Sequence, residues 1–124
     1  MDVYKTREFA RWARKQSLRD AALYEAVREM AEGLYDADLG GNLFKKRIAR
    51  SGQGKSGGFR TLVATNRGNR WFFVYGFAKN ERGNIDEAEE AALKRLAAAL
   101  LTVPAASLSK ALEAGELIEV NDDD

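Results

Sequence analysis

The stretch Arg70–Lys79, with the sequence RWFFVYGFAK, decides the fold of this chain. Every position from 71 to 78 is hydrophobic or glycine, so a strand here has no face suited to water. A strand that is apolar on both faces is expected to be a central strand of its sheet. Strict alternation puts Trp71, Phe73, Tyr75, Phe77 and Lys79 on one face and Phe72, Val74, Gly76 and Ala78 on the other. The small side chains of the second set predict a place where another group approaches the sheet closely.

Two further strands are expected before this one, Leu43–Arg50 and Gly58–Thr65. The turn sequence Asn66-Arg67-Gly68-Asn69 joins the second of them to Arg70–Lys79 and is typical of a hairpin. We therefore expect antiparallel pairing within this block.

Helices are expected before and after the strand block. Thr6 is a suitable N-cap for a first helix. A long third helix is expected to start near residue 84 or 86 and to end before Pro104, because proline cannot continue a helix. A second helix is expected from about residue 18 or 20 to residue 34, a short fourth one between Ser107 and Gly115, and short strands at residues 3–5 and 117–120. This order predicts one α+β domain over residues 1–124, an antiparallel β-sheet with an N-terminal helical hairpin and a C-terminal helix packed on one face.

Composition restricts the chemistry. The 124 residues include no cysteine and no histidine, which excludes disulfides, thiolate metal sites and the usual general base near neutral pH. Catalysis would depend on Lys, Arg, Tyr or carboxylates. The N-terminus has no apolar signal core, and we expect a cytoplasmic location.

The net charge of +1 conceals three unequal segments. Residues 1–42 hold 7 Lys or Arg and 8 Asp or Glu, residues 43–82 hold 10 and 1, and residues 83–124 hold 3 and 10. A concentration of cations of this size is typical of a site for a polyanion. The alternatives are an accident of the surface or an intramolecular match to the acidic last third.

A loose phosphate-loop motif runs from Ala49 to Ser56, ARSGQGKS. That loop requires a helix directly after it, whose amides hold the phosphate. Here the following residues, from Gly57 to Val63, predict a strand. Nucleotide hydrolysis is therefore not expected.

Five cations of the strand block are expected to meet at one rim of the sheet. Lys45 and Arg47 lie on the outward face of their strand. Arg60 begins the middle strand, and Lys79 and Arg82 follow the end of its antiparallel neighbour, so pairing brings these three together.

Several cations without histidine suit a phosphate group, because guanidinium and ammonium groups bind its oxygens and stabilise added negative charge in the transition state. RNA supplies its own nucleophile, the 2′-hydroxyl. Neighbouring positive charge makes a lysine less basic, so that it can lose its own proton and then act as a base. Composition does not distinguish this chemistry from a site that binds phosphate without cutting.

Three motifs in order resemble the HigB branch of the RelE/ParE toxins of bacterial type II toxin–antitoxin pairs. They are Leu43–Arg50 (LFKKRIAR), the loop from Gly52 that ends in KSGGFR at Arg60, and Tyr75–Arg82 (YGFAKNER). The resemblance covers roughly residues 3 to 101 and leaves residues 102–124 as a C-terminal extension.

The resemblance implies a RelE-like fold and an mRNA endoribonuclease that acts on the ribosome, inhibits translation and needs neither a metal nor another cofactor. It also implies a cognate helix-turn-helix antitoxin that represses the shared operon, so that operator DNA is reached only through the antitoxin. No membrane partner is implied.

Residue by residue, the family implies a catalytic cluster at the positions named above. Arg60 matches the arginine that contacts the scissile phosphate, Lys45 and Arg47 match a basic pair, and Lys79 and Arg82 fall in the cationic segment after the last central strand. The remaining residues expected to bind RNA are Lys46, Arg50, Lys55, Asn80 and Tyr75.

Two positions depart from the family pattern. Asn80 stands where a functional arginine is expected, and Ile85 and Asp86 stand where a tyrosine is expected, so that Tyr75 or Phe77 would have to stack on a base. Two other functions stay open, a ParE-like toxin that inhibits gyrase and a non-catalytic RNA-binding domain.

Overall fold

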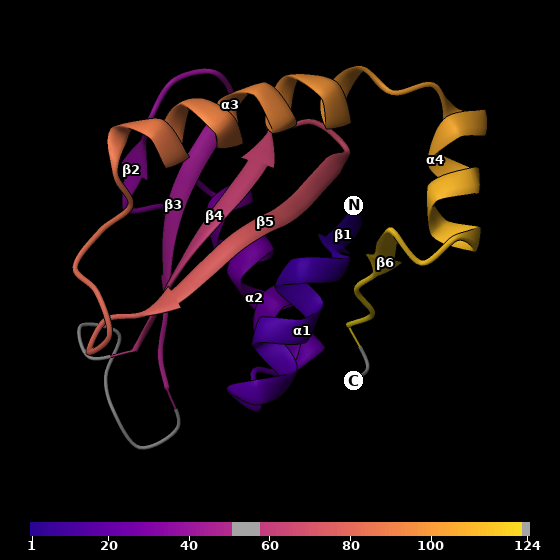
Figure 1. Ribbon diagram of the computed structural model, residues 1–124. Coiled ribbons are helices and arrows are strands. Elements are labelled where there is room, and N and C mark those ends of the chain that lie inside the picture. Colours follow the sequence, from indigo (N-terminus) through magenta and orange to yellow (C-terminus); the bar gives the residue numbers. More distant parts are fainter. Residues whose placement is uncertain (51–57, 123–124) are drawn as a thin grey trace.

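The computed structural model describes residues 1–50 and 58–122. Within them, the strands form a single sheet in the order β2-β3-β4-β5-β1-β6, with β5 inside it (Figure 1). Most pairs are antiparallel as expected, but β1 runs parallel to β5, so the sheet is mixed. The strands are β1 Asp2–Thr6, β2 Ala37–Asp38, β3 Leu43–Ile48, β4 Phe59–Thr65, β5 Arg70–Ala78 and β6 Leu117–Glu119.

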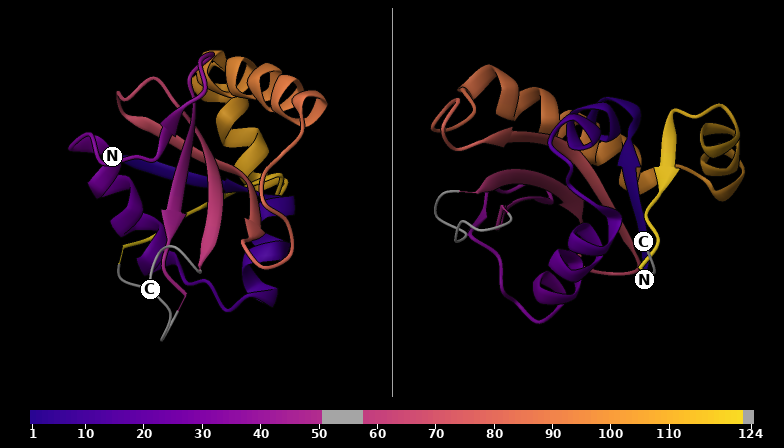
Figure 2. Two further views of the ribbon diagram at one scale, coloured as in Figure 1. Left: turned by 90° about the vertical axis from the view of Figure 1, so that its left-hand side faces the viewer. Right: turned by 90° about the horizontal axis from the view of Figure 1, so that it is seen from below.

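Helices cover both faces of the sheet, where one covered face was expected. Figure 2 shows α2 and α3 on opposite sides of the strands. The apolar run of β5 explains the difference, because each of its faces must be removed from water. The helices are α1 Arg7–Lys15, α2 Asp20–Ala31, α3 Glu87–Thr102 and α4 Ala105–Glu113.

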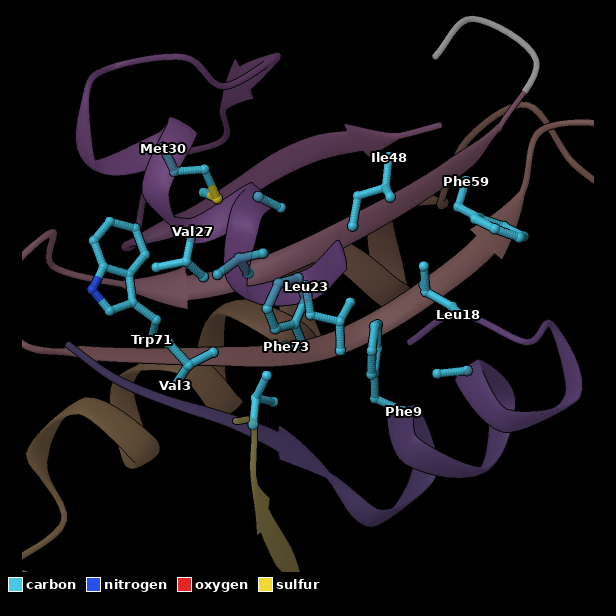
Figure 3. Close-up of a cluster of buried hydrophobic side chains, with 14 of the residues drawn as sticks. Val3, Phe9, Leu18, Leu23, Val27, Met30, Ile48, Phe59, Trp71 and Phe73 are labelled. Carbon is cyan, nitrogen blue, oxygen red and sulfur yellow. The ribbon is translucent and has the colours of Figure 1, made fainter. Parts of the chain in front are cut away.

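Two apolar cores result, one on each side of the sheet. The first lies under α1 and α2 and includes Phe9, Val27 and Phe73, which point toward one another in Figure 3. The second lies under α3 and α4 and includes Phe72 and Ala97. The α+β class predicted from the sequence is confirmed.

A β-bulge in the centre of the sheet changes which side chains share a face. The register of β4 and β5 shifts between Leu62, which pairs with Tyr75, and Val63, which pairs with Phe73. The expectation of strict alternation along β5 is therefore wrong beyond Val74. The bulge places Tyr75 and Phe77 in the second core with Phe72 and Val74, opposite to Trp71 and Phe73.

The group that approaches the sheet closely at Gly76 is the indole of Trp12. A Cβ atom on Gly76 would lie 2.3 Å from Trp12 Cζ3. Trp12 also packs edge-on against Phe59, with ring centroids 5.4 Å apart. The glycine thus allows α1 to seat its aromatic side chain directly on the middle of β5.

Local signals for helix ends agree with the structure at several points. The Thr6 side chain accepts a hydrogen bond from Phe9 N, and Asp86 and Glu89 form a capping box at the start of α3. Helix α2 ends at Ala31, three residues earlier than expected, just before Gly33 at a φ of 94°. The expected edge strand at the C-terminus is β6, which pairs with β1.

No single helix among the described residues is both long and apolar enough to span a membrane. Helices α3 and α4 reach that length only as a pair, and they are bent by 113°.

Replacing Gly76 by alanine should destabilise the protein by about 1–3 kcal/mol, because the new methyl group would overlap the Trp12 ring. Urea denaturation of Gly76→Ala measures this loss. Gly83→Ala is the matched control, since a Cβ there meets nothing within 4 Å. In a Trp12→Ala background the Gly76→Ala change should cost much less, and an equal loss in both backgrounds would contradict the packing described here.

Candidate nucleic-acid interface

Two cross-strand rows form the centre of the candidate site, on the sheet face that carries α3. Arg47 pairs with Arg60, and Arg60 pairs with Phe77. The second row lies two residues further along β4, on the same face. There Leu62 pairs with Lys45 of β3 on one side and with Tyr75 of β5 on the other. Neighbouring strands lie about 4.8 Å apart, so these side chains stand next to one another.

Arg82 lies beside these rows and has several partners. Its guanidinium donates two hydrogen bonds to the Glu89 carboxylate, at 2.6 and 3.0 Å, and one to the Tyr75 hydroxyl at 3.1 Å. It also lies over the Phe77 ring, 5.6 Å from its centroid. Arg82 therefore joins the end of β5 to the first turn of α3.

Glu89 performs two tasks with one carboxylate. It accepts the hydrogen bonds of Arg82 and also one from Asp86 N, which closes the capping box of α3. The hydrogen bond from Arg82 and that from the Asp86 amide lower the pKa of Glu89 to about 2. The same hydrogen bond raises the pKa of Arg82.

Arg47 and Lys45 are held at the outer part of the site. Asp36 accepts hydrogen bonds from both the backbone and the guanidinium of Arg47, each at 2.6 Å. Burial raises the pKa of Asp36, but the hydrogen bonds from Arg47 outweigh it and the net shift is downward. Lys45 Nζ donates to the side-chain oxygen of Asn84 at 2.9 Å.

Exposure differs strongly among the predicted catalytic residues. Arg60 is 8% exposed, whereas Lys79 and Asn80 are exposed where the chain leaves β5. In the described part of the chain, the Lys79 side chain has no hydrogen-bond or ion-pair partner. The structure thus brings together Lys45, Arg47, Arg60 and Arg82, with Lys79 at the end of the same strand as Tyr75.

The residues expected to bind RNA are dispersed. Lys46 lies on the opposite face, 4% exposed, with Nζ 2.8 Å from Glu29 and bonded to the Leu34 carbonyl, so it does not join the others. Arg50 stacks over Phe59 and donates to Gln16 on the α1 side. Tyr75 is half-buried with its hydroxyl bonded to Arg82, and Lys55 lies outside the described residues.

The phosphate-loop motif also lies mostly outside the described residues. The element that follows it is strand β4, as expected, and not the helix that a phosphate-binding loop requires. Over residues 1–50 and 58–122 there is no cluster of three or more acidic side chains able to hold a metal ion.

Sequence reasoning missed three partners of the cluster, Asp36, Asn84 and Glu89. Each lies outside the basic strand block, and none of them was predicted as a partner of its cations. The capping box was a usable signal, because Glu89 stands three residues after Asp86. Nothing in the linear spacing indicates that the same carboxylate also holds Arg82.

A mixed sheet with a helical pair on one face and a capped helix on the other, carrying adjacent arginines, is consistent with the RelE/ParE toxin superfamily. The family model described as "RelE toxin of RelE / RelB toxin-antitoxin system" matches residues 1–120, and the chain belongs to this family. It is therefore a toxin of a toxin–antitoxin system, and the membership implies a cognate antitoxin. Searches of curated proteins and of solved structures gave no significant match.

The Glu89–Arg82 pair predicts a pH dependence of stability. A carboxylate whose pKa falls from 4.5 to about 2 on folding stabilises the protein fully above pH 4.5, and this contribution disappears as the pH falls through 2. The difference in free energy of unfolding between the wild type and Glu89→Gln should therefore be constant near neutral pH and shrink between about pH 5 and 2.

Urea denaturation across this pH range measures the difference. Glu87→Gln, in the same first turn of α3 but with an exposed side chain, is the control and should show much less change. A difference that is the same at pH 2 and pH 7 would show that Glu89 contributes no carboxylate-specific stability.

Proposed function

We propose that this toxin is a HigB-like, metal-independent endoribonuclease that cleaves mRNA on the ribosome and thereby inhibits translation. The observation that carries the proposal is the row Arg47–Arg60–Phe77, flanked by Lys45, Tyr75 and Arg82. Arginines that are neighbours on one sheet face repel each other, and a phosphate group relieves that repulsion.

The chemistry needs only the RNA and these side chains. The 2′-oxygen attacks the adjacent phosphorus while the bond from phosphorus to the 5′-oxygen breaks, leaving a cyclic phosphate and a free 5′-hydroxyl. The proton of the 2′-hydroxyl passes to a basic group, for which Lys45 or Lys79 is the candidate, and another proton reaches the 5′-oxygen. Arg60 stabilises the charge that accumulates on the phosphate oxygens.

RNA must compete with internal partners for two of the arginines. Glu89 holds Arg82 through two hydrogen bonds, and Asp36 holds Arg47. Because Arg60 is nearly buried, productive binding requires neighbouring side chains to move, and Arg82, which covers Phe77, is the obvious one. The ribosome would supply the binding energy for this rearrangement.

The finer assignments follow from the same proposal. A toxin that acts on ribosomes would work in the cytoplasm. The partner of a HigB-like toxin would be a helix-turn-helix antitoxin that carries it to operator DNA. Tyr75 and Phe77 are the aromatic side chains beside Arg60, and Tyr75, the more exposed, is the candidate for stacking on a base.

A non-catalytic RNA-binding domain is the second candidate. The ion pairs of Arg47 and Arg82 favour it, since they reduce the positive charge available to a transition state. A ParE-like action on gyrase is less well supported, because that contact between proteins does not need adjacent arginines on one face.

Arg60→Ala should lower the single-turnover rate of mRNA cleavage on programmed ribosomes by about 10²–10³, if Arg60 stabilises charge that develops only in the transition state. Binding of the same ribosomes should change little. Arg60→Lys should recover only part of the rate, because an ammonium group cannot reproduce the planar, two-pronged contact of a guanidinium.

Arg67→Ala is the control for charge, since Arg67 lies in the exposed β4–β5 turn. A thermal melt of each variant checks that the nearly buried position still folds. Cleavage by Arg60→Ala at the wild-type rate would show that the site is misplaced. Equal losses of binding and rate would support the second candidate instead.

The cognate antitoxin should present acidic residues to the basic cluster, and its association should weaken as salt is raised from about 0.1 to 0.5 M. Titration calorimetry at several salt concentrations measures this. An affinity that does not respond to salt would indicate an apolar contact away from Lys45, Arg47 and Lys79.

A further inference from the structure

Residues 79–86, the segment that joins β5 to α3, include one residue in contact with two cations of the candidate site. The side-chain oxygen of Asn84 accepts a hydrogen bond from Lys45 Nζ at 2.9 Å. The backbone carbonyl of the same residue accepts one from Arg82 Nε at 3.0 Å. Asn84 is exposed, and its contact with Lys45 joins two positions that are 39 residues apart in the chain. This contact is set by the fold, and it gives Asn84 a place in the site.

The atom of Asn84 that faces Lys45 is its oxygen. Ile85 N, which can only donate a hydrogen bond, also lies 2.9 Å from this atom. Ile85 is buried in the second core, and Asp86 begins the capping box of α3. The amide oxygen is therefore fixed by its own segment, and its two lone pairs are directed to Ile85 N and to Lys45 Nζ. Unlike a free surface side chain, Asn84 determines where the Lys45 amine lies.

The partner of Lys45 is uncharged, which distinguishes this lysine from the cations around it. Arg47, Arg82 and Lys46 each form an ion pair with a carboxylate. Within residues 1–50 and 58–122, Lys45 forms no ion pair. A nearby carboxylate favours the charged form of a lysine, whereas an amide oxygen accepts a hydrogen bond without adding a charge. Lys45 is thus held in place without a negative charge that would keep its proton on it.

Lys45 also lies within reach of the phosphate that Arg60 would bind. Lys45 pairs with Leu62, and Arg60 stands two residues before Leu62 on the same face, so the two basic side chains are diagonal neighbours. Such neighbours are about 7–8 Å apart, a distance that long side chains span. A guanidinium on the phosphate oxygens and an amine beside the adjacent 2′-hydroxyl can therefore act on one phosphodiester.

Lys79, the other lysine considered as the base, is not held in this way. It is exposed where the chain leaves β5, and its side chain has no hydrogen-bond or ion-pair partner in the described part of the chain. A general base must lie within hydrogen-bond reach of the proton that it takes. A lysine that is ordered only when RNA binds loses rotamer entropy at that moment, and a lysine that is already held does not. The geometry therefore favours Lys45.

We propose that Asn84 is a positioning residue that holds Lys45 as the base of RNA cleavage. This rests on the proposed function and decides between the two lysines that it left open. Lys45, after releasing a proton to water, takes the proton of the 2′-hydroxyl as the 2′-oxygen bonds to phosphorus. The bond from phosphorus to the 5′-oxygen breaks, its electron pair stays on that oxygen, and water donates a proton there. Asn84 accepts a hydrogen bond from the Lys45 amine and touches no reacting atom.

The test is Asn84→Asp, which keeps the size of the side chain and its acceptor oxygen and adds one negative charge. The carboxylate should hold the proton on Lys45, so the rising limb of the pH–rate profile should move to higher pH by about one pH unit. Single-turnover cleavage on saturating programmed ribosomes, measured from about pH 6 to 9, should be about tenfold slower near neutral pH, and the difference should narrow toward the alkaline end. Asn84→Ala should be slower at every pH, because it leaves the lysine unheld.

Asn66→Asp is the matched control. Asn66 also accepts a backbone hydrogen bond with its side-chain oxygen, from Gly68 N, but it lies in the exposed β4–β5 turn, at the other end of these strands. This variant should keep the wild-type profile. In a Lys45→Ala background, Asn84→Asp should leave the remaining rate unchanged, because its effect acts through Lys45. Ribosome affinity and melting temperature are measured for each variant, and for Asn84→Asp both should stay close to the wild-type values.

An identical pH–rate profile for Asn84→Asp and the wild type would overturn the role of Asn84. A rate loss that persists in the Lys45→Ala background would overturn it too, since Asn84 would then act on something other than Lys45. If the rising limb disappears in Lys79→Ala and stays in Lys45→Ala, Lys79 is the base and the proposal fails. A wild-type protein that binds ribosomes and cuts no mRNA would instead overturn the proposed nuclease itself, and the assignment of its base would fall with it.

Discussion

The fold depends on one constraint, the burial of strand β5 on both of its faces. Trp71 and Phe73 must be covered on one side, and Phe72 and Val74 on the other, and all four are nearly inaccessible to water. A single helical layer cannot satisfy this requirement. The helical pair α1 and α2 covers one face, and α3 with α4 covers the other, so that the sheet becomes the middle of three layers.

The bulge in β5 connects this constraint to the candidate site. Without the register shift after Leu62, Tyr75 and Phe77 would face α1, and Gly76 would face α3. The shift places both aromatic side chains beside Arg60 and Lys45, and it leaves Gly76 to receive Trp12. One extra residue in one strand thus supplies both the aromatic side of the site and the seat of α1.

Electrostatic pairing inside the molecule has a similar double effect. The acidic last third of the chain supplies Glu89, which both caps α3 and holds Arg82, and Asp36 holds Arg47 from the edge next to β2. The sequence left open whether the basic block is matched by the acidic last third of the chain. The ion pair of Arg82 with Glu89 shows that part of the block is matched in this way. Lys79 is exposed to solvent and has no such partner in the described ranges.

The sequence by itself determined the α+β class, the central position of β5, the hairpin with β4, the helix cap at Thr6 and the start of α3 near residue 86. These features follow from local signals, namely apolar periodicity, turn residues and capping side chains, which act within a few residues of one another. The tertiary structure alone decided that helices cover both faces, that β1 runs parallel to β5 and that Lys46 turns away from Lys45 into an ion pair with Glu29. The tertiary structure also decided the pairing of Arg82 with Glu89. Contacts across a bulge or between separate elements depend on strand register and on packing, and no periodic pattern in the sequence predicts either of these.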